Sequence, residues 1–479
     1  GLADSFQSMQ FVERQVSGGK KVSLTLEKPS PQISDIIFAW AEPTLLGGAD
    51  FVNFAADEAR LVHLAAYRVT GGERTFSPLD LRDKLDLDLA SYINLTDQVV
   101  DGGIEWMAPE GNWVLVATYQ MPVGSVPVLY ASETPGFVLD HMRSDLVQGH
   151  YAYVFGKRTG LDQYHGKGFR GFFNDSLEFK VNRLTRFDIL DQFEKRRGYD
   201  LRPFLPALSN EAADSFYFVE VLGPRPGPAY VLTDQDERLR YDYQLTISDL
   251  IIENFVATSA KWAEDRGMVS RAQSYGMDLD AIRAFGANTI PETEQLYAGG
   301  GDVAQRLASS AALLYGKPLV SAESFVWIHR SHATTPRKVK AAADKMFING
   351  INHIIYHGVP YEWYGGERGD GTLGEEGWHP FSAPMPDEEG GRGMTFSSFI
   401  SPNNPMWPGF VQANRYIARA QNLLQAGEQQ IDVLLYYPFL GMPRSFAESK
   451  VAAAETLFDG QMLDAEVPSE ITHGALIGV

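Results

Sequence analysis

Four carboxylates follow short apolar runs, at positions where buried parallel strands would end. They are Asp175, Glu178, Glu294 and Glu323. In α/β sheets and barrels, the carboxyl ends of the strands form the face that holds the site. Paired carboxylates suit the cleavage of a glycosidic bond, because a protonated one assists the leaving oxygen and an ionised one activates water or attacks carbon. A single Glu of this kind is more often a solvated loop residue, so the prediction depends on the combination.

Aromatic and imidazole side chains near these acids could contact a sugar. Trp side chains stack on sugar rings, although each one is more often part of a core. The histidines form no His-Glu-x-x-His pattern, which argues against a zinc site. Carboxylates in a chain without cysteine instead favour a hard cation such as calcium. We predict that the substrate site includes Asp140, His141, Asp175, Trp327, His329, His357 and Trp363.

Alternating strands and helices are predicted from about residue 131 onward. Short apolar runs bounded by Gly and Pro predict strands, and apolar residues at helical spacing predict helices between them. This alternation is typical of βα repeats and predicts an α/β fold with a (β/α)8 TIM-barrel catalytic domain over 131–428. The expected strands are 169–175, 268–273, 289–294, 318–322 and 351–357, and the expected helices are 185–197, 246–266, 302–315, 336–349 and 410–425.

The first 130 residues have a β-rich texture. Val22, Leu24 and Leu26 alternate with polar residues, and apolar runs recur at 60–69 and 113–121. Such alternation predicts an N-terminal, β-sandwich-like module over 1–130. Residues 429–479 are expected to begin a further, incomplete α/β or β domain. The chain begins at Gly1 without Met or a signal core, so we expect it to be a piece of a longer polypeptide.

Composition restricts the classes of partner. The 479 residues are 44% hydrophobic, which is enough for large cores, and carry a net charge of −20. Such acidity argues against a nucleic-acid partner and against an anionic membrane surface. The sequence contains no run of about 18 apolar residues, so no transmembrane helix is predicted. The absence of cysteine excludes disulfides and thiolate nucleophiles but fits several compartments. The expected location is periplasmic or secreted.

A series of motifs extends over nearly the whole chain, and its order and spacing resemble those of glycoside hydrolase family 106, the α-L-rhamnosidases. The motifs are GGKKVSLTLEKP (18–29), PGFVLDH (135–141), FFNDSLEF (172–179), FEKRRGYDLRPFLP (193–206), YDYQLTISDLIIENF (241–255), IPETE (290–294), ASSAALLYGKPLVSAESF (308–325), DKMFINGINHIIYHG (344–358) and YIARAQNLLQAG (416–427).

The resemblance implies a (β/α)8 catalytic domain, calcium dependence and hydrolysis of terminal α-L-rhamnosides with inversion. By motif, Glu178 would be the general acid, Glu294 the general base and Glu323 a calcium ligand, with the acid and base roles open to exchange. Inversion would require carboxyl groups roughly 6.5–9.5 Å apart. Two alternatives stay open: a barrel glycosidase of other sugar specificity, such as a retaining β-galactosidase-like enzyme, and a non-catalytic carbohydrate-binding protein.

Overall fold

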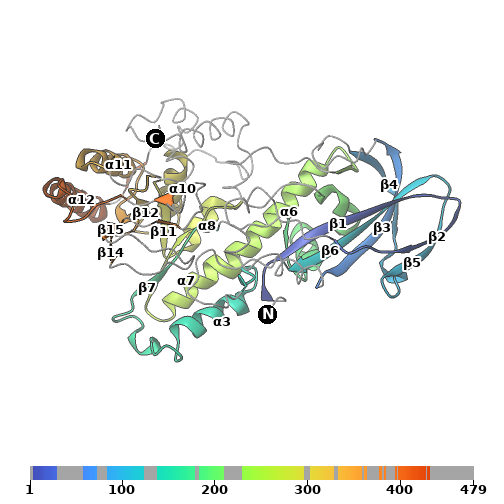
Figure 1. Ribbon diagram of the computed structural model, residues 1–479, viewed down its shortest axis with the longest axis horizontal. Helices are drawn as coiled ribbons and strands as arrows, with labels where there is room; N and C mark the ends of the chain where they lie inside the picture. The colour runs from blue at the N-terminus through green and yellow to red at the C-terminus, as the bar shows by residue number, and fades with distance from the viewer. Residues whose placement is uncertain are drawn as a thin grey trace. The chain divides into compact units, whose positions relative to one another are not determined.

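The protein divides into two compact units in a computed structural model (Figure 1). We call Gly1–Gly160, Glu178–Thr258 and Gly276–Leu279 the antiparallel unit, and Leu161–Leu177, Ser259–Tyr275 and Asp280–Val479 the parallel unit. This grouping differs from the predicted division at residues 130 and 428. The structure describes residues 4–29, 58–72, 84–122, 137–177, 183–209, 229–295, 302–327, 333–358, 361–363, 377–379, 382–383, 394–395, 398–427 and 429–431.

A six-stranded sheet forms the centre of the antiparallel unit, in the order β8-β1-β6-β3-β4-β9. Neighbouring strands of this sheet are antiparallel, except that β9 runs parallel to β4. Trp113 and Leu115 of β6 pack with Leu64 of β3 in an apolar cluster, as the alternation of their strands predicts. The strands are β1 (Gln7–Ser17), β3 (Arg60–Gly71), β4 (Leu85–Asn94), β6 (Asn112–Pro122), β8 (Leu184–Thr185) and β9 (Tyr230–Val231); β2 (Lys20–Thr25) and β5 (Gly103–Ala108) form a separate pair.

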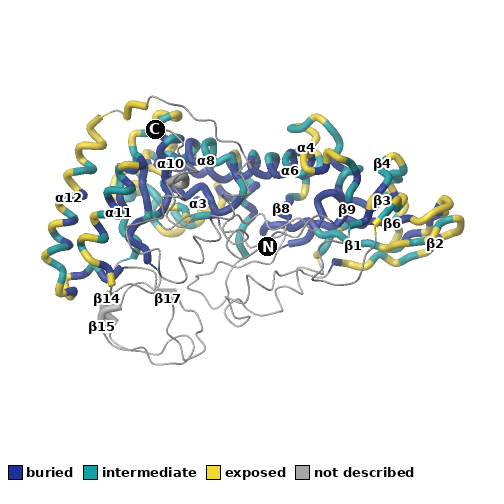
Figure 2. The backbone as a smooth tube through the Cα atoms, turned by 90° about the horizontal axis from the view of Figure 1, so that it is seen from above, coloured by how far each residue is buried: buried dark blue, intermediate teal, exposed yellow. Residues whose placement is uncertain are grey.

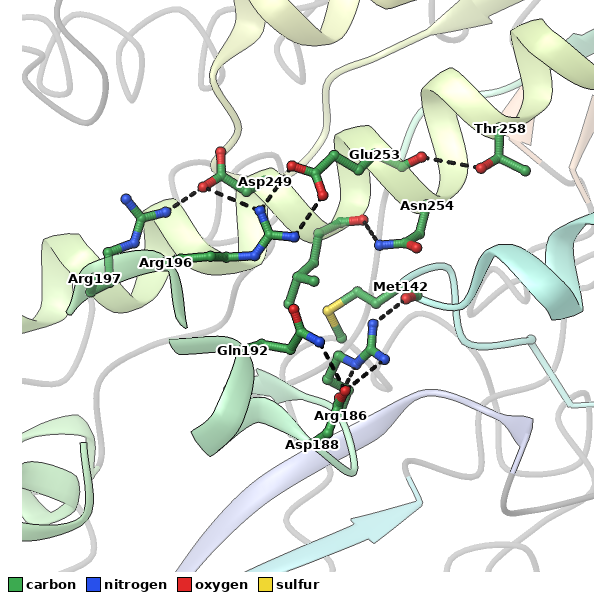
Figure 3. Close-up of polar contacts among 11 residues, drawn as sticks. Met142, Arg186, Asp188, Gln192, Arg196, Arg197, Asp249, Glu253, Asn254 and Thr258 are labelled. Carbon is green, nitrogen blue, oxygen red and sulfur yellow. Dashed lines mark hydrogen bonds and ion pairs between the residues drawn. The ribbon is translucent and has the colours of Figure 1, made fainter. Parts of the chain in front are cut away.

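Helices of the antiparallel unit are joined by ion pairs, of which Arg197–Asp249 is largely buried (Figure 3). Helix α4 (Ile189–Arg197) ends at Gly198, whose φ of 84° is the left-handed conformation that glycine adopts readily. Arg196 donates to both oxygens of Glu253, at 2.8 and 2.6 Å, and Arg197 pairs with Asp249. The partners lie on α6 (Asp236–Ile251) and on the π-helical turn Ile252–Val256 that leads into α7 (Ala257–Glu264).

Helix α6 begins ten residues before the predicted start at 246. The carboxylate of Asp236 accepts hydrogen bonds from the backbone N–H groups of Leu232 and Thr233, at 2.8 and 3.1 Å. These bonds stabilise the entry into the helix, where a carboxylate is favoured by the helix dipole. The ten residues before 246 are mostly polar, and some of them, such as Asp242 and Gln244, are buried, so they carry little apolar periodicity for the sequence pattern to detect. Helix α3 (Ser144–Phe155) precedes it in the chain.

A five-stranded parallel sheet forms the parallel unit, in the order β13-β12-β11-β10-β7. Every strand predicted from 169–175 onward lies in it, which confirms the alternation of strands and helices. A mixed α/β fold is therefore present, although the described residues do not form a complete (β/α)8 barrel. The strands are β7 (Gly171–Asn174), β10 (Val269–Gln273), β11 (Ile290–Glu294), β12 (Ser321–Ser324) and β13 (His353–Tyr356).

Helices cover one face of this sheet. Ser324 of β12 contacts Met346 of α11, and the Tyr356 hydroxyl of β13 donates to Asn414 of α12 at 2.5 Å. Figure 2 shows buried residues recurring along α11 and along the first half of α12, as expected of helices with one face on a sheet. The helices are α8 (Ala281–Ala287), α10 (Asp302–Leu314), α11 (Pro336–Ile348) and α12 (Trp407–Ala426).

Two short hairpins follow β13, namely β14 (Tyr361–Trp363) with β15 (Gly377–His379) and β16 (Ser382–Ala383) with β17 (Met394–Thr395). The further domain predicted over 429–479 lies, from residue 432 onward, outside the described residues. Within the described ranges, none of the helices combines the length and hydropathy needed to cross a bilayer.

Candidate active site

The parallel sheet has one polar face. Residues two apart on a strand point to the same side, and register partners on neighbouring strands lie next to one another. The register pairs Gln273 with Glu292, Glu292 with Ser321, and Glu294 with Glu323. Parallel strands are usually apolar on both faces, so a run of charged residues on one face is a departure that requires a reason. We call this face, formed by Arg271, Gln273, Glu292, Glu294, Ser321 and Glu323, the carboxylate face.

Glu292 is the most enclosed carboxylate of this face. Its exposed fraction is 0%, and its Oε2 lies 3.0 Å from Nε of Arg271 and accepts from the Ser321 hydroxyl at 2.6 Å. Burial raises the pKa of Glu292, while the positive charge of Arg271 opposes that shift. A side chain without exposure cannot contact a substrate directly. Glu292 therefore belongs to the support of the site.

Glu294 and Glu323 are the more accessible carboxylates. The exposed fraction of Glu294 is 9%, and that of the Glu323 side chain is 14%. Gln273 donates from Nε2 to Oε2 of Glu323 at 2.8 Å, and Nε2 of His357 lies 3.4 Å from Oε1. Burial lowers the pKa of His357, which favours the neutral imidazole. Two carboxylates in register can thus meet a ligand on the same side of the sheet.

Asp175 lies near this group. Desolvation raises the pKa of Glu292 and lowers the pKa of His357; the negative charge of Asp175 adds to the first shift and opposes the second. Asp175 directly follows β7, and His357 directly follows β13. The structure therefore gathers four of the residues predicted from the strand ends: Asp175, Glu294, Glu323 and His357.

Trp327 lies in an apolar environment with an exposed fraction of 5%. Its ring stacks on Phe325 at 6.2 Å between centroids, and the ammonium group of Lys338 lies 4.2 Å from the ring centroid. Phe325 has a φ of 69°, an unusual backbone conformation for a bulky side chain. Its N–H donates to Oε1 of Gln295 at 2.6 Å, which helps to hold that turn immediately after β12.

Asp140 and His141 lie in the antiparallel unit. Asp140 accepts from the N–H of Met142 at 2.8 Å, and burial raises its pKa to about 6. The His141 ring lies between Phe6 and Phe255, at centroid distances of 4.9 and 4.2 Å, and its Nδ1 donates to the Leu139 carbonyl. Burial lowers the pKa of His141 to about 4. Both side chains are thus held by contacts within the antiparallel unit.

Three predicted residues cannot be placed in the site. Glu178 and His329 lie outside the described residues, and of Trp363 only the backbone, in β14, is described. Within the described ranges, no three His, Asp or Glu side chains converge as a metal site requires. Glu323 would need further ligands from other segments to hold a calcium ion, and no step proposed below passes through a metal.

Sequence reasoning missed the partners of the acids. Arg271, Gln273 and Tyr275 recur every second residue along and just beyond β10, and Glu292 stands two residues before Glu294. Polar residues at a period of two within a buried parallel strand were the available signal, because such residues must share one face.

Comparisons with known proteins give a family match, a curated relative and a similar structure. A sequence profile described as α-L-rhamnosidase, that of glycoside hydrolase family 106, matches residues 55–362. A Formosa agariphila protein named "Putative beta-glucuronidase" is 24% identical over 447 residues, which cover 90% of this chain and 34% of that protein. The structure of a rhamnosidase from Novosphingobium sp. PP1Y has a similar fold, with a TM-score of 0.55 and 19% identity, over 90% of this chain and 51% of that one.

The chain therefore spans about a third of the length of the first relative and about half of the second. The likeness to the solved rhamnosidase establishes the mixed α/β fold. The family match covers more than half of the 479 residues. The chain accordingly belongs to glycoside hydrolase family 106, the α-L-rhamnosidase family.

Proposed function

We propose that this protein removes terminal α-L-rhamnose from rhamnosides or rhamnose-containing glycans, with inversion at the anomeric carbon. The observation that carries the proposal is the carboxylate face, because it presents Glu294 and Glu323 side by side in a chain of this family. The reaction requires a base, the role proposed for Glu294, and an acid, the role proposed for Glu178. A closed (β/α)8 barrel around the same face and a periplasmic or secreted location are part of the proposal.

The proposed roles follow the resemblance. Glu178 would protonate the leaving oxygen, and Glu294 would take a proton from the attacking water. Glu323 would bind calcium. Glu323 is also the second candidate for the base, because its side chain is the more exposed and donors lie at both of its oxygens. A base held in one orientation by such donors can meet the water without reorganisation.

Rhamnose is a neutral sugar with a methyl group at C5, so its site needs hydrogen-bonding groups and no counter-ion. The second candidate substrate is a β-glucuronide, which the name of the Formosa relative suggests. A glucuronide carries a carboxylate and would need a cation. Among the described residues of the carboxylate face, the cation is Arg271, and it is paired with Glu292. The charge balance of this face supports a neutral sugar.

Release of 4-nitrophenol from its α-L-rhamnoside tests the substrate, with the β-D-glucuronide and β-D-galactoside in parallel. We expect turnover of the rhamnoside alone. An NMR time course of the first product should show the inverted anomer, whereas a retained configuration excludes the proposed mechanism. Hydrolysis of only the glucuronide would transfer the proposal to uronic acids, and sugar binding without any hydrolysis would support a binding protein.

Removal of divalent cations tests the calcium prediction. Treatment with EDTA should abolish turnover of the rhamnoside, and added calcium should restore it. Activity that survives complete removal of calcium, verified by elemental analysis, would exclude the metal from the reaction.

A further inference from the structure

A glutamine on β10 contacts a carboxylate two strands away. Gln273 is 1% exposed and lies in register with Glu292 of β11, while Glu323 lies in register with Glu294 of the same strand. Strands on either side of β11 are separated by about 9–10 Å. The 2.8 Å hydrogen bond from Gln273 to Glu323 therefore spans β11 diagonally, between the positions of Glu292 and Glu294.

Tyr275 fixes the orientation of the Gln273 amide. Its hydroxyl donates to Oε1 of Gln273 at 2.8 Å, and Tyr275 itself is 4% exposed. Because the amide oxygen accepts from Tyr275, the amide nitrogen points toward Glu323. A carboxylate needs donors, so the opposite orientation of the amide would place two acceptors together. The chain Tyr275, Gln273, Glu323 thus has one consistent direction of donation.

The support is electrically neutral. Arg271, the cation of the described carboxylate face, is engaged by the deeper Glu292. Glu323 accepts a hydrogen bond from the uncharged amide of Gln273 at 2.8 Å. A neutral donor orients a carboxylate while leaving it basic, as either a proton acceptor or a cation ligand must be.

We infer that Gln273 and Tyr275 are positioning residues, which hold the Glu323 carboxylate over β11. This inference rests on the proposed glycosidase function but not on the identity of the sugar. Without the amide, the Glu323 carboxylate loses the donor at its Oε2, and a misplacement of about 1 Å at such a site costs on the order of 100-fold in rate.

The test uses Gln273→Met, which keeps the length of the side chain and removes both the donor and the acceptor. We expect kcat for the active glycoside to fall by about 10- to 100-fold, with KM within about twofold, because the substrate still binds while the transition state is less well stabilised. Tyr275→Phe keeps the bond to Glu323 and loses only the group that orients the amide. We expect it to lower kcat by about 3- to 10-fold.

Gln305→Met is the matched control in the same unit. Gln305 is also 1% exposed and accepts from Asn349 at 2.9 Å, on the helix side of the sheet. It should lower thermal stability to a similar degree and leave kcat unchanged. An unchanged kcat in Gln273→Met, or an equal loss in Gln305→Met, would overturn the inference.

Two further outcomes separate this inference from the proposed function. If the wild type hydrolyses another glycoside in place of the rhamnoside, the proposed function fails, and the same variants measured on that glycoside still decide the inference. If the wild type hydrolyses none, crystal structures of the wild type and Gln273→Met decide it. We expect the Glu323 carboxylate to turn in the variant, and an unmoved carboxylate would contradict the inference.

Discussion

The two sheets of this protein bury polar groups in opposite ways. In the antiparallel sheet, His63 is enclosed beside neutral hydroxyl groups of Tyr92 and Thr96, at 3.1 and 2.9 Å. Burial lowers its pKa to about 4, so it is held as a neutral group. In the parallel sheet, buried charges are connected from strand to strand, as in the contact of Arg271 with Glu292. A single neutralised group serves the packing, whereas connected carboxylates on one face indicate chemistry.

Two of the ion pairs differ strongly in exposure. Arg14 and Glu27 of the antiparallel unit are paired with side chains that are 52% and 66% exposed, so water screens their attraction. Arg271 and Glu292 are 21% and 0% exposed. Removing one member of a buried pair leaves the other charge buried without compensation. Removing one member of an exposed pair leaves a charge that water still solvates. The exposure of an ion pair, more than its N–O distance, therefore decides how much free energy of unfolding is lost when one member is removed.

The largest effect is expected from Glu294→Gln. If the carboxylate face is catalytic, loss of the base should lower kcat by about 10²- to 10⁴-fold while the protein stays folded. Glu105→Gln is the control, because Glu105 is an exposed residue of β5 paired with Lys21, and its kcat should not change. Steady-state kinetics and circular dichroism measure both variants.

Glu323→Gln completes that comparison. A variant that has lost the base should form the inverted glycosyl azide when azide replaces water, whereas a variant that has lost a calcium ligand should instead recover at high calcium. An active Glu294→Gln enzyme, together with azide rescue of Glu323→Gln, would transfer the role of the base to Glu323.

Arg271→Met tests the buried ion pair. We expect it to lower the free energy of unfolding by about 3–5 kcal/mol, because Glu292 would be left buried without its partner. Arg14→Met should cost less than about 1 kcal/mol. Urea unfolding of the two variants measures the difference, and equal losses would remove the distinction between the sheets. The double variant Arg271→Met with Glu292→Leu should recover much of the stability.

Acid titration tests the isolated histidine. The folded pKa of His63 is about 4, below the ordinary value of 6.5, so its neutral form is the one the fold favours. Its contribution to stability is complete above pH 6.5 and is lost as the pH falls toward 4, by about 3 kcal/mol in total. His63→Gln keeps partners for Tyr92 and Thr96 and cannot titrate, so its unfolding free energy should fall less between pH 7 and pH 4. Parallel losses in both proteins would show that His63 is not responsible.

The smallest effect is expected on the helix side of the parallel sheet. The hydroxyl of Thr335 accepts from the N–H of Lys338 at 3.2 Å and caps α11. Thr335→Ala should lower the free energy of unfolding by about 1 kcal/mol and leave kcat unchanged. A fall in kcat with that variant would show that the two faces of the sheet are not independent.

The sequence by itself determined where the elements of the parallel unit lie and which of them end in acids. Strand 290–294 and helix 302–314 follow from apolar spacing and from local stop signals such as Gly316, since both depend on residues close together in the chain. The placement of Glu294 and Glu323 after such runs was visible for the same reason.

Only the tertiary structure decided how the acids are supported. The contact of Gln273 with Glu323, the enclosure of Glu292 and the packing of Trp327 against Phe325 depend on strand order, register and exposure. These join residues up to fifty positions apart in the chain, over distances at which periodicity carries no information. Local patterns determine which face a side chain occupies, and long-range register determines what it meets there.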